Sequence, residues 1–192
     1  MDIRAAARPE PGGHGFEQPF EMLHACHEKV ERLLGLLERL AVHVRTQGPD
    51  AQAREAARDV MRYFDLAAPL HHEDEELHVL PCLLAAAEPT LAALARQLTE
   101  EHRRLADAWA DLRADLLRLI GLGDEASGAG WQARADWVGF AAAYRRHLEL
   151  EESVAYPAAQ ALLTVQATDR MSEDMMQRRG HLLAARAGTP GA

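Results

Sequence analysis

Histidine and glutamate recur with the same spacing in two segments of this 192-residue chain. Residues 71–81 read HHEDEELHVLP and residues 147–157 read HLELEESVAYP. Each segment has His at its first position, a pair of Glu at its fifth and sixth, and Pro at its eleventh. On an α-helix, a residue and the one four positions later lie on the same face. A histidine and a glutamate placed in this way can bind one metal centre together, so the repetition predicts two half-sites.

Apolar residues recur every three or four positions over most of the chain, a pattern typical of amphipathic helices. These stripes run through residues 20–44, 60–82, 91–119 and 133–158, and each is interrupted by histidine or by histidine and glutamate. Buried imidazoles and carboxylates destabilise a fold unless they are paired, protonated or bound to a cation. We therefore predict that six residues converge as metal ligands: His27, His71, Glu75, His102, His147 and Glu151.

The predicted ligands offer nitrogen and oxygen atoms and no thiolate. Such a set suits iron or manganese, whereas a zinc site takes fewer ligands. Helical cores of this kind commonly hold two metal ions bridged by carboxylates. Cys26 and Cys82 stand alone without CxxC spacing, which argues against a thiolate zinc site and against a disulfide framework.

Helix-forming residues dominate from about residue 20 onward, and Pro and Gly mark where the helices end. We expect four long helices, over about residues 20–46, 51–87, 89–121 and 131–164. Pro69 is expected to bend the second helix, and Pro81 to loosen its end. A shorter helix over residues 172–179 is expected to follow, capped by Ser172 and ended by Gly180.

Long helices with short connections predict an all-α fold, an up-down four-helix bundle with a short C-terminal extra helix. We divide the chain into a flexible N-terminal arm (1–18), the bundle (19–166), and a short C-terminal helix and tail (167–192). The sequence has neither a signal-peptide pattern nor a run of about 20 apolar residues, so we expect a cytoplasmic protein without a membrane partner. A net charge of −9 without a basic face argues against a nucleic-acid partner.

At these positions the chain resembles the hemerythrin-like, HHE cation-binding family. The resemblance covers about residues 20–160 and rests on HACHEKV, EEHRRL and the doubled pattern H-x3-EE-x4-P. It implies a non-heme, usually di-iron centre, capped by histidines and bridged by Glu75 and Glu151. Proteins of this kind bind or sense oxygen, nitric oxide or peroxide, or handle iron. The resemblance thus implies two iron ions per chain, in preference to manganese or zinc.

Two positions depart from the pattern of the oxygen-carrying hemerythrins. Those proteins have a second histidine four residues after the ligand of the third helix, where this chain has Ala106. They also have an aspartate five residues after the histidine of the fourth helix, where this chain has Glu152. One metal ion would then lack a protein nitrogen, and water, His24 or His78 would take that place. The departures favour an open binding, sensing or reactive site over a reversible oxygen carrier.

Adjacent histidines leave the register of the second helix open, because His72 and Glu76 have the same spacing as His71 and Glu75. The preceding apolar stripe favours His71. So does Leu148, a non-ligating residue that occupies the position equivalent to His72 in the second segment. We therefore expect His72 at the surface, and predict that His72→Leu keeps the iron whereas His71→Leu loses metal. Glu76 and its equivalent are expected to be solvated or to lie behind the ligands.

The function that this interpretation favours is a module that binds or senses oxygen, nitric oxide or peroxide. The alternatives are an enzyme that turns over peroxide or nitric oxide, and a structural or iron-storage site. No acid–base pair outside the site indicates a substrate, so catalytic residues stay unassigned. The sequence also leaves the oligomeric state unassigned. A ferritin-like arrangement, suggested by Glu21-x-x-His24 and Glu75-x-x-His78, is disfavoured because the third helix has no glutamate on its apolar face.

Overall fold

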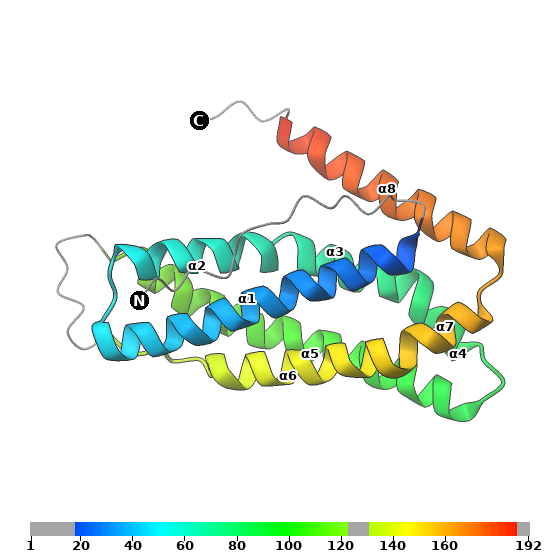
Figure 1. The fold of residues 1–192 in the computed structure, drawn as a ribbon, viewed down its shortest axis with the longest axis horizontal. Coiled ribbons are helices and arrows are strands. Elements are labelled where there is room, and N and C mark those ends of the chain that lie inside the picture. The colour runs from blue at the N-terminus through cyan, green and yellow to red at the C-terminus, as the bar shows by residue number, and fades with distance from the viewer. Residues whose placement is uncertain (1–17, 123–130, 188–192) are drawn as a thin grey trace.

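Every element in the described part of the chain, residues 18–122 and 131–187 of the computed structural model, is helical (Figure 1). The all-α class is therefore confirmed for these residues. The expected N-terminal arm and most of the expected loop at residues 121–130 lie outside them. In chain order the elements are α1 (Pro19–Gln47), α2 (Ala51–Phe64), α3 (Ala67–Asp74), the π-helical η1 (Glu75–Val79), α4 (Leu80–Leu84), α5 (Pro89–Ile120), α6 (Trp137–Leu150), the π-helical η2 (Glu151–Ala155), α7 (Tyr156–Leu162) and α8 (Val165–Ala187).

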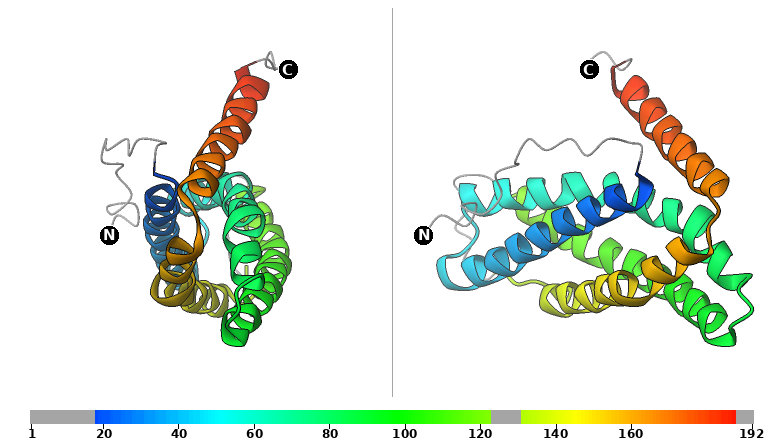
Figure 2. Two further views of the ribbon diagram at one scale, coloured as in Figure 1. Left: turned by 90° about the vertical axis from the view of Figure 1, so that its right-hand side faces the viewer. Right: turned by 45° about the vertical axis from the view of Figure 1, so that its right-hand side comes forward.

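The long helices lie side by side along their length (Figures 1 and 2). α1 packs against α2 and α6, and α5 packs against α2, α4 and α6. The second and fourth helical runs also meet where α4 contacts α7. α8 lies outside these helices, contacts α1, and points its C-terminal end away from them (Figure 2). Within the described residues, no helix combines the length and the apolar character needed to cross a membrane.

A layer of polar residues separates two apolar clusters in the core. In α1, Leu23 belongs to one cluster, Val30 belongs to the other, and His27 lies between them. His102 of α5 lies in the same way between leucines of the two clusters. Apolar burial stabilises a fold by roughly 25 cal/mol per Å². The helices are therefore held together on both sides of the polar layer, which fixes the side chains within it.

The second helical run breaks one turn before Pro69. α2 ends at Phe64 and α3 begins at Ala67, so the chain leaves the helix at Asp65 and Leu66. A proline ring clashes with the carbonyl group four residues earlier and has no N–H to bond it, and that carbonyl belongs to Asp65. The bend expected at Pro69 is thus a full interruption of the helix.

Two π-helical turns begin at the paired glutamates. The Leu80 N–H donates to the carbonyl of Glu75, and the Tyr156 N–H donates to the carbonyl of Glu151, five residues back in each case. Each donor directly precedes the proline at the eleventh position of its segment. Because a proline ring clashes with an ordinary helical carbonyl four residues earlier, a wider turn relieves that contact. The sequence predicts a change near each proline, but the π turn itself was not expected.

The fourth long helix begins later than expected, at Trp137 rather than near residue 131. Asp136 caps it by accepting a hydrogen bond from the Gly139 N–H at 2.8 Å. The preceding residues are held away from a helical path by Asp115 of α5. Its carboxylate accepts hydrogen bonds from the backbone N–H groups of residues 134 and 135.

α8 spans Val165–Ala187 and is longer than the helix expected over residues 172–179. Ser172, the expected cap, is buried inside α8, and Gly180 does not end it. A glycine costs a helix only about 1 kcal/mol. It therefore does not end a helix whose flanking residues favour one.

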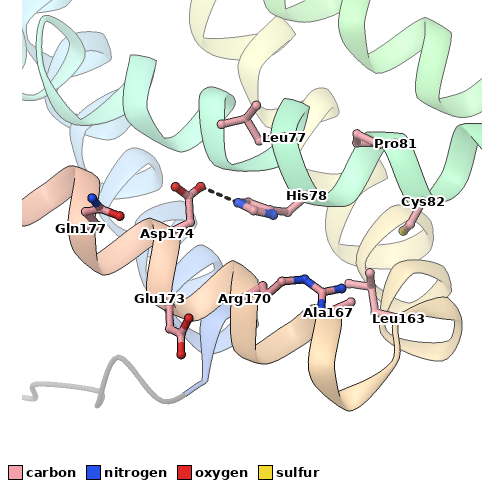
Figure 3. A pocket seen from close by; sticks show the side chains of 10 residues that line it. All are labelled: Leu77, His78, Pro81, Cys82, Leu163, Ala167, Arg170, Glu173, Asp174 and Gln177. Carbon is pink, nitrogen blue, oxygen red and sulfur yellow. Dashed lines mark hydrogen bonds and ion pairs between the residues drawn. The ribbon is translucent and has the colours of Figure 1, made fainter.

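Charged side chains fasten α8 to the second helical run. Asp74, which is fully buried, accepts a hydrogen bond from Arg179 Nη2 at 2.5 Å and pairs with Arg178 Nη2 at 2.7 Å. Farther along α8, Asp174 Oδ2 lies 2.7 Å from His78 Nε2 at the edge of a pocket between the two helices (Figure 3). Because Asp74 precedes Glu75 directly, these pairs also support the start of the π turn.

Candidate metal centre

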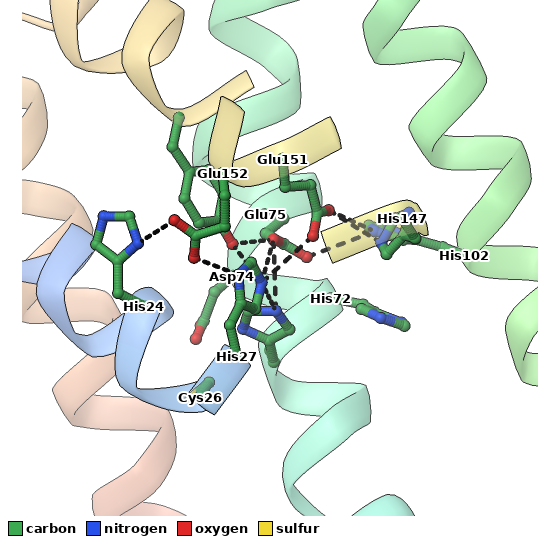
Figure 4. Close-up of polar contacts among 12 residues, drawn as sticks. His24, Cys26, His27, His72, Asp74, Glu75, His102, His147, Glu151 and Glu152 are labelled. Carbon is green, nitrogen blue, oxygen red and sulfur yellow. Dashed lines mark hydrogen bonds and ion pairs between the residues drawn. The ribbon is translucent and has the colours of Figure 1, made fainter. Parts of the chain in front are cut away.

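The polar layer brings together all six residues that the sequence proposes as metal ligands. Figure 4 labels all of them except His71. Each of them exposes no more than 4% of its surface. They come from all four long helical runs: His27 from α1, His71 from α3, Glu75 from η1, His102 from α5, His147 from α6 and Glu151 from η2. Residues far apart in the sequence therefore converge at one level of the helices.

Four of these residues form a first donor group, made of His27, His71, Glu75 and Glu151, whose ligand atoms lie within 4.8 Å of one another. His27 Nε2 is 2.9 Å from His71 Nε2 and 3.3 Å from Glu151 Oε2. His71 Nε2 is 3.5 Å from Glu75 Oε1. These spacings allow one cation to contact all four side chains.

A second donor group consists of His72, His102 and His147. The His72 ring stacks on the His102 ring, with centroids 4.1 Å apart and planes 6° from parallel, and meets the His147 ring edge-on. The expectation that His72 lies at the surface is therefore wrong. Successive helical residues differ by about 100° in direction, so His71 and His72 reach the two donor groups from one helix.

The two glutamates of the first donor group also reach histidines of the second. Glu75 turns Oε1 toward His71, and its Oε2 lies 3.4 Å from His102 Nε2. Glu151 turns Oε2 toward His27, and its Oε1 lies 3.0 Å from His147 Nε2. Each carboxylate thus presents one oxygen to each group, as a carboxylate that bridges two metal ions must.

Several polar atoms of the layer are buried without a hydrogen bond. They are His71 Nδ1, Glu75 Oε2, His102 Nε2, His147 Nε2 and both carboxylate oxygens of Glu151. An unpaired buried polar atom costs about 1–3 kcal/mol, and more when it is charged. All of these atoms except His71 Nδ1 make the close contacts that define the two groups. A bound cation would satisfy them, so the residues present fit a metal.

Three of the imidazoles turn their other ring nitrogen toward a carboxylate outside the layer. The pairs are His27 Nδ1 with Glu152 Oε1 (2.6 Å), His102 Nδ1 with Glu76 Oε1 (3.0 Å) and His147 Nδ1 with Glu101 Oε2 (2.9 Å). A carboxylate that accepts from Nδ1 orients the ring and makes Nε2 a better ligand. Glu76 and Glu152 thus lie behind the histidines and stay partly exposed.

The carboxylates and imidazoles of the layer shift one another's pKa values. Burial alone lowers the pKa of His102, but the Glu151 and Glu75 carboxylates, 3.5 and 3.4 Å from its Nε2, outweigh burial and raise this pKa to about 10. Burial and the charge of Glu151 raise the pKa of Glu75 to about 7. Burial would also raise the pKa of Glu151, yet the surrounding histidines, His147 foremost, hold it well below its usual range.

The remaining histidines fall into two classes. Burial lowers the pKa of His27 and His147, but Glu151 outweighs burial and raises both values. Burial and the charge of neighbouring histidines hold the pKa values of His71 and His72 well below the usual range. Without a metal, protons on the first class balance the buried carboxylates. A metal cation would replace those protons, because ligand imidazoles must be neutral.

Two buried tyrosines border the layer, and the sequence pattern indicates a role for neither. Tyr156 Oη lies 3.0 Å from His27 Nε2 and donates a short hydrogen bond to Glu75. Tyr144 Oη lies 2.9 Å from His72 Nε2. Tyr144 lies on the apolar stripe of the fourth helix, three residues before a predicted ligand, and that position could have identified it. The position of Tyr156 depends on the π turn.

The other histidines considered as ligands lie outside both donor groups. His24 Nδ1 is 2.6 Å from Glu152 Oε2, so it pairs with a carboxylate that itself holds His27. His78 pairs with Asp174 of α8. The nitrogen that the sequence analysis expected to be supplied by water, His24 or His78 is offered by His72.

Comparison with known proteins agrees with this geometry. A protein of Haemophilus influenzae, described as uncharacterized, is 30% identical over 164 residues, which cover 85% of this chain and 91% of that protein. The family model of the hemerythrin HHE cation binding domain matches residues 18–159, a range that contains both donor groups. The chain therefore belongs to the hemerythrin HHE cation-binding domain family, and its clustered histidines and glutamates are able to hold a metal.

Proposed function

We propose that this protein carries a non-heme centre of two iron ions and uses it to bind or sense oxygen, nitric oxide or peroxide. The observation that carries the proposal is the pair of donor groups that share Glu75 and Glu151. Seven donor residues exceed what one six-coordinate ion can use. Two ions bridged by the shared carboxylates account for all seven.

The types of donor atom favour iron. Five of the seven residues are histidines, and imidazole suits iron, whereas manganese prefers carboxylate, carbonyl and water oxygens. Zinc in structural sites is bound by four ligands, often thiolates. Neither cysteine belongs to a donor group, and Cys82 Sγ donates to the carbonyl of Val79.

A surface cavity lies beside one histidine of the centre. It has a volume of about 570 Å³ and is lined by His24, His27 and Glu152 among others. In this proposal a diatomic molecule or a peroxide approaches from this side. Bound iron would supply an open coordination position and a change of oxidation state. Along the helices, the two apolar clusters exclude water from both faces of the polar layer.

The scaffold in this proposal is an up-down four-helix bundle. The packing of α1 and of α5 against both α2 and α6 supports that arrangement. The net charge of −9 supports a small-molecule partner over a nucleic acid. The proposal takes binding or sensing as the function and keeps turnover of peroxide or nitric oxide as the alternative.

Metal analysis tests the proposal directly. The protein is loaded anaerobically with ferrous iron and desalted, and its iron is measured per chain. We expect close to two ions per chain, and a visible spectrum that changes when oxygen, nitric oxide or hydrogen peroxide is added. The double variant Glu75→Ala/Glu151→Ala controls for loosely bound iron. Iron at the level of that control would contradict the proposal.

Steady-state consumption of hydrogen peroxide separates binding from catalysis. A binding or sensing protein changes its spectrum once and then stops, whereas an enzyme consumes peroxide in excess over its iron. Sustained turnover that depends on Glu75 would replace the binding function with an enzymatic one.

A further inference from the structure

The hydroxyl group of Tyr156 contacts the first donor group. Tyr156 is the first residue of α7, exposes 1% of its surface, and stacks its ring on that of His27. Its Oη is 3.0 Å from His27 Nε2 and bonds Glu75 Oε1. It thus contacts two of the four residues of this group.

The Tyr156 oxygen lies about as far from His27 Nε2 as other donor atoms of the group do. In a six-coordinate site with bonds of about 2.1 Å, neighbouring ligand atoms lie about 3.0 Å apart. His27 Nε2 has three such neighbours: His71 Nε2 at 2.9 Å, Glu151 Oε2 at 3.3 Å and Tyr156 Oη at 3.0 Å. The phenol oxygen therefore fits a corner of the same coordination polyhedron.

We propose that Tyr156 is a further protein ligand of the metal ion bound by His27, His71, Glu75 and Glu151. This assignment rests on the proposed function, because it needs a metal at the first donor group. Binding releases the phenol proton to solvent, as metal binding releases protons from other ligands. No electron transfer or further reactant is involved.

The backbone explains why this tyrosine reaches the layer. Tyr156 follows Glu151 by five residues, and the π turn η2 places residues five apart on one face of the helix. The equivalent position in the first segment is Leu80, which has no ligand atom. The tenth position of the first segment therefore brings no phenol oxygen to the layer.

Tyr144 is the matched control, because it is also buried and also contacts a donor histidine. Its Oη lies 2.9 Å from His72 Nε2. No hydrogen bond joins it to Glu75 or Glu151 in the described part of the chain. It should therefore stay a phenol when the metal binds.

The visible spectrum of protein loaded with ferric iron tests the assignment. A phenolate bound to ferric iron gives a broad charge-transfer band in the middle of the visible range. We expect this band in the wild-type protein and in Tyr144→Phe, and its loss in Tyr156→Phe at unchanged iron content. A spectrum without the band in the iron-loaded wild type, or one that Tyr156→Phe leaves unchanged, overturns the assignment.

Resonance Raman spectra of the wild type keep the test decisive if Tyr156→Phe does not fold. Excitation into the band should enhance phenolate ring vibrations, and these should shift in protein made with ring-deuterated tyrosine. Vibrations that do not shift would overturn the assignment. Iron content separates the two ideas: iron at two per chain without phenolate vibrations rejects only the ligand, whereas absence of bound iron rejects the proposed function as well.

Discussion

The segments at residues 71–81 and 147–157 have the same backbone conformation and differ at two positions next to the polar layer. Both leave the α-helix at a glutamate, make a π turn, and resume an α-helix with proline at its second position. In both, the second glutamate holds a histidine of another helix: Glu76 holds His102, and Glu152 holds His27. The paired prolines and glutamates therefore encode a common local structure.

The differences make the two donor groups unequal. At the second position the first segment has His72, a member of the second donor group, where the other segment has the buried Leu148. At the tenth position it has the buried Leu80, where the other segment has Tyr156. The first segment thus adds a nitrogen to one group, and the second adds an oxygen to the other. Two differences on a repeated backbone thus produce two donor groups of different composition.

Removal of the first glutamate of either segment's pair, Glu75 or Glu151, should cause the largest loss of iron. Glu75→Ala and Glu151→Ala each remove a carboxylate that contacts both donor groups. We expect each variant to lose nearly all iron, as measured by elemental analysis after desalting. Glu149→Ala, which removes an exposed glutamate of the second segment, is the control. Retention of both ions in either glutamate variant would exclude a bridging role for that residue.

The difference at the second position, His72 against Leu148, predicts a partial loss of iron. His72→Leu gives the first segment the residue of the second and removes one of three imidazoles from the second donor group. We expect iron to fall from about two ions per chain to about one, whereas His43→Leu, outside both groups, has no effect. The sequence alone predicts that His72→Leu keeps its iron. That result would mean that each segment supplies one histidine and one glutamate to the site, as the sequence predicts.

Protonation should distinguish the histidines of the two segments. Contacts with the carboxylates outweigh burial and raise the pKa values of His27, His102 and His147, so these histidines keep their protons to a higher pH than free imidazoles do. His71 and His72, with pKa values lowered mainly by burial, do not. The three imidazole protons alone predict that metal affinity falls by up to about 1000-fold per unit of decreasing pH.

Proton release on iron loading, measured with an indicator dye in weak buffer, checks this prediction. The same linkage acts on the metal-free fold. The pKa of His102 in the folded protein is about 10, above its value of about 6.5 in an unfolded chain. Its stabilising effect is therefore complete below about pH 6.5 and is lost as the pH rises through about 10. An iron content that stays constant between about pH 7 and pH 5 would exclude histidines as the main ligands.

The second glutamates of the two segments should have equal and smaller effects. Glu76→Gln and Glu152→Gln each remove the charge that orients a ligand histidine, without removing a ligand. We expect each to lower metal affinity by about 10–100-fold, measured by competition with a chelator. Glu73→Gln is the control, because its exposed carboxylate pairs with Arg178 of α8. A large loss in only one variant would show that the shared hydrogen bonds are not equivalent.

The sequence predicts the shared part of the segments better than the differing part. His71, Glu75, His147 and Glu151 are assigned to the layer by helical spacing together with the apolar stripe on each helix, because residues four apart share a face. The sequence does not assign His72 to the site, because the comparison with Leu148 assumes that two segments with the same motif have the same surroundings.

Other features depend on contacts that a local pattern does not encode. Tyr156 reaches the layer only through the π turn, which breaks the regular helical period. The late start of α6 depends on Asp115, about twenty residues earlier in the chain. In both cases a proline-induced turn or a distant side chain, rather than local propensity, sets the position of the backbone.

The smallest effect is expected at the eighth position of the segments, where the first has His78 and the second has Val154. His78 points toward α8 and pairs with the partly exposed Asp174 instead of entering the layer (Figure 3). His78→Val should therefore keep the full iron content and the spectrum of the loaded protein. A partly exposed pair contributes at most about 1 kcal/mol, so urea denaturation should show a decrease of that size or less in the free energy of unfolding. Loss of iron would instead make Glu75 and His78 a ligand pair of the ferritin type, and would place the first segment in a different register from the second.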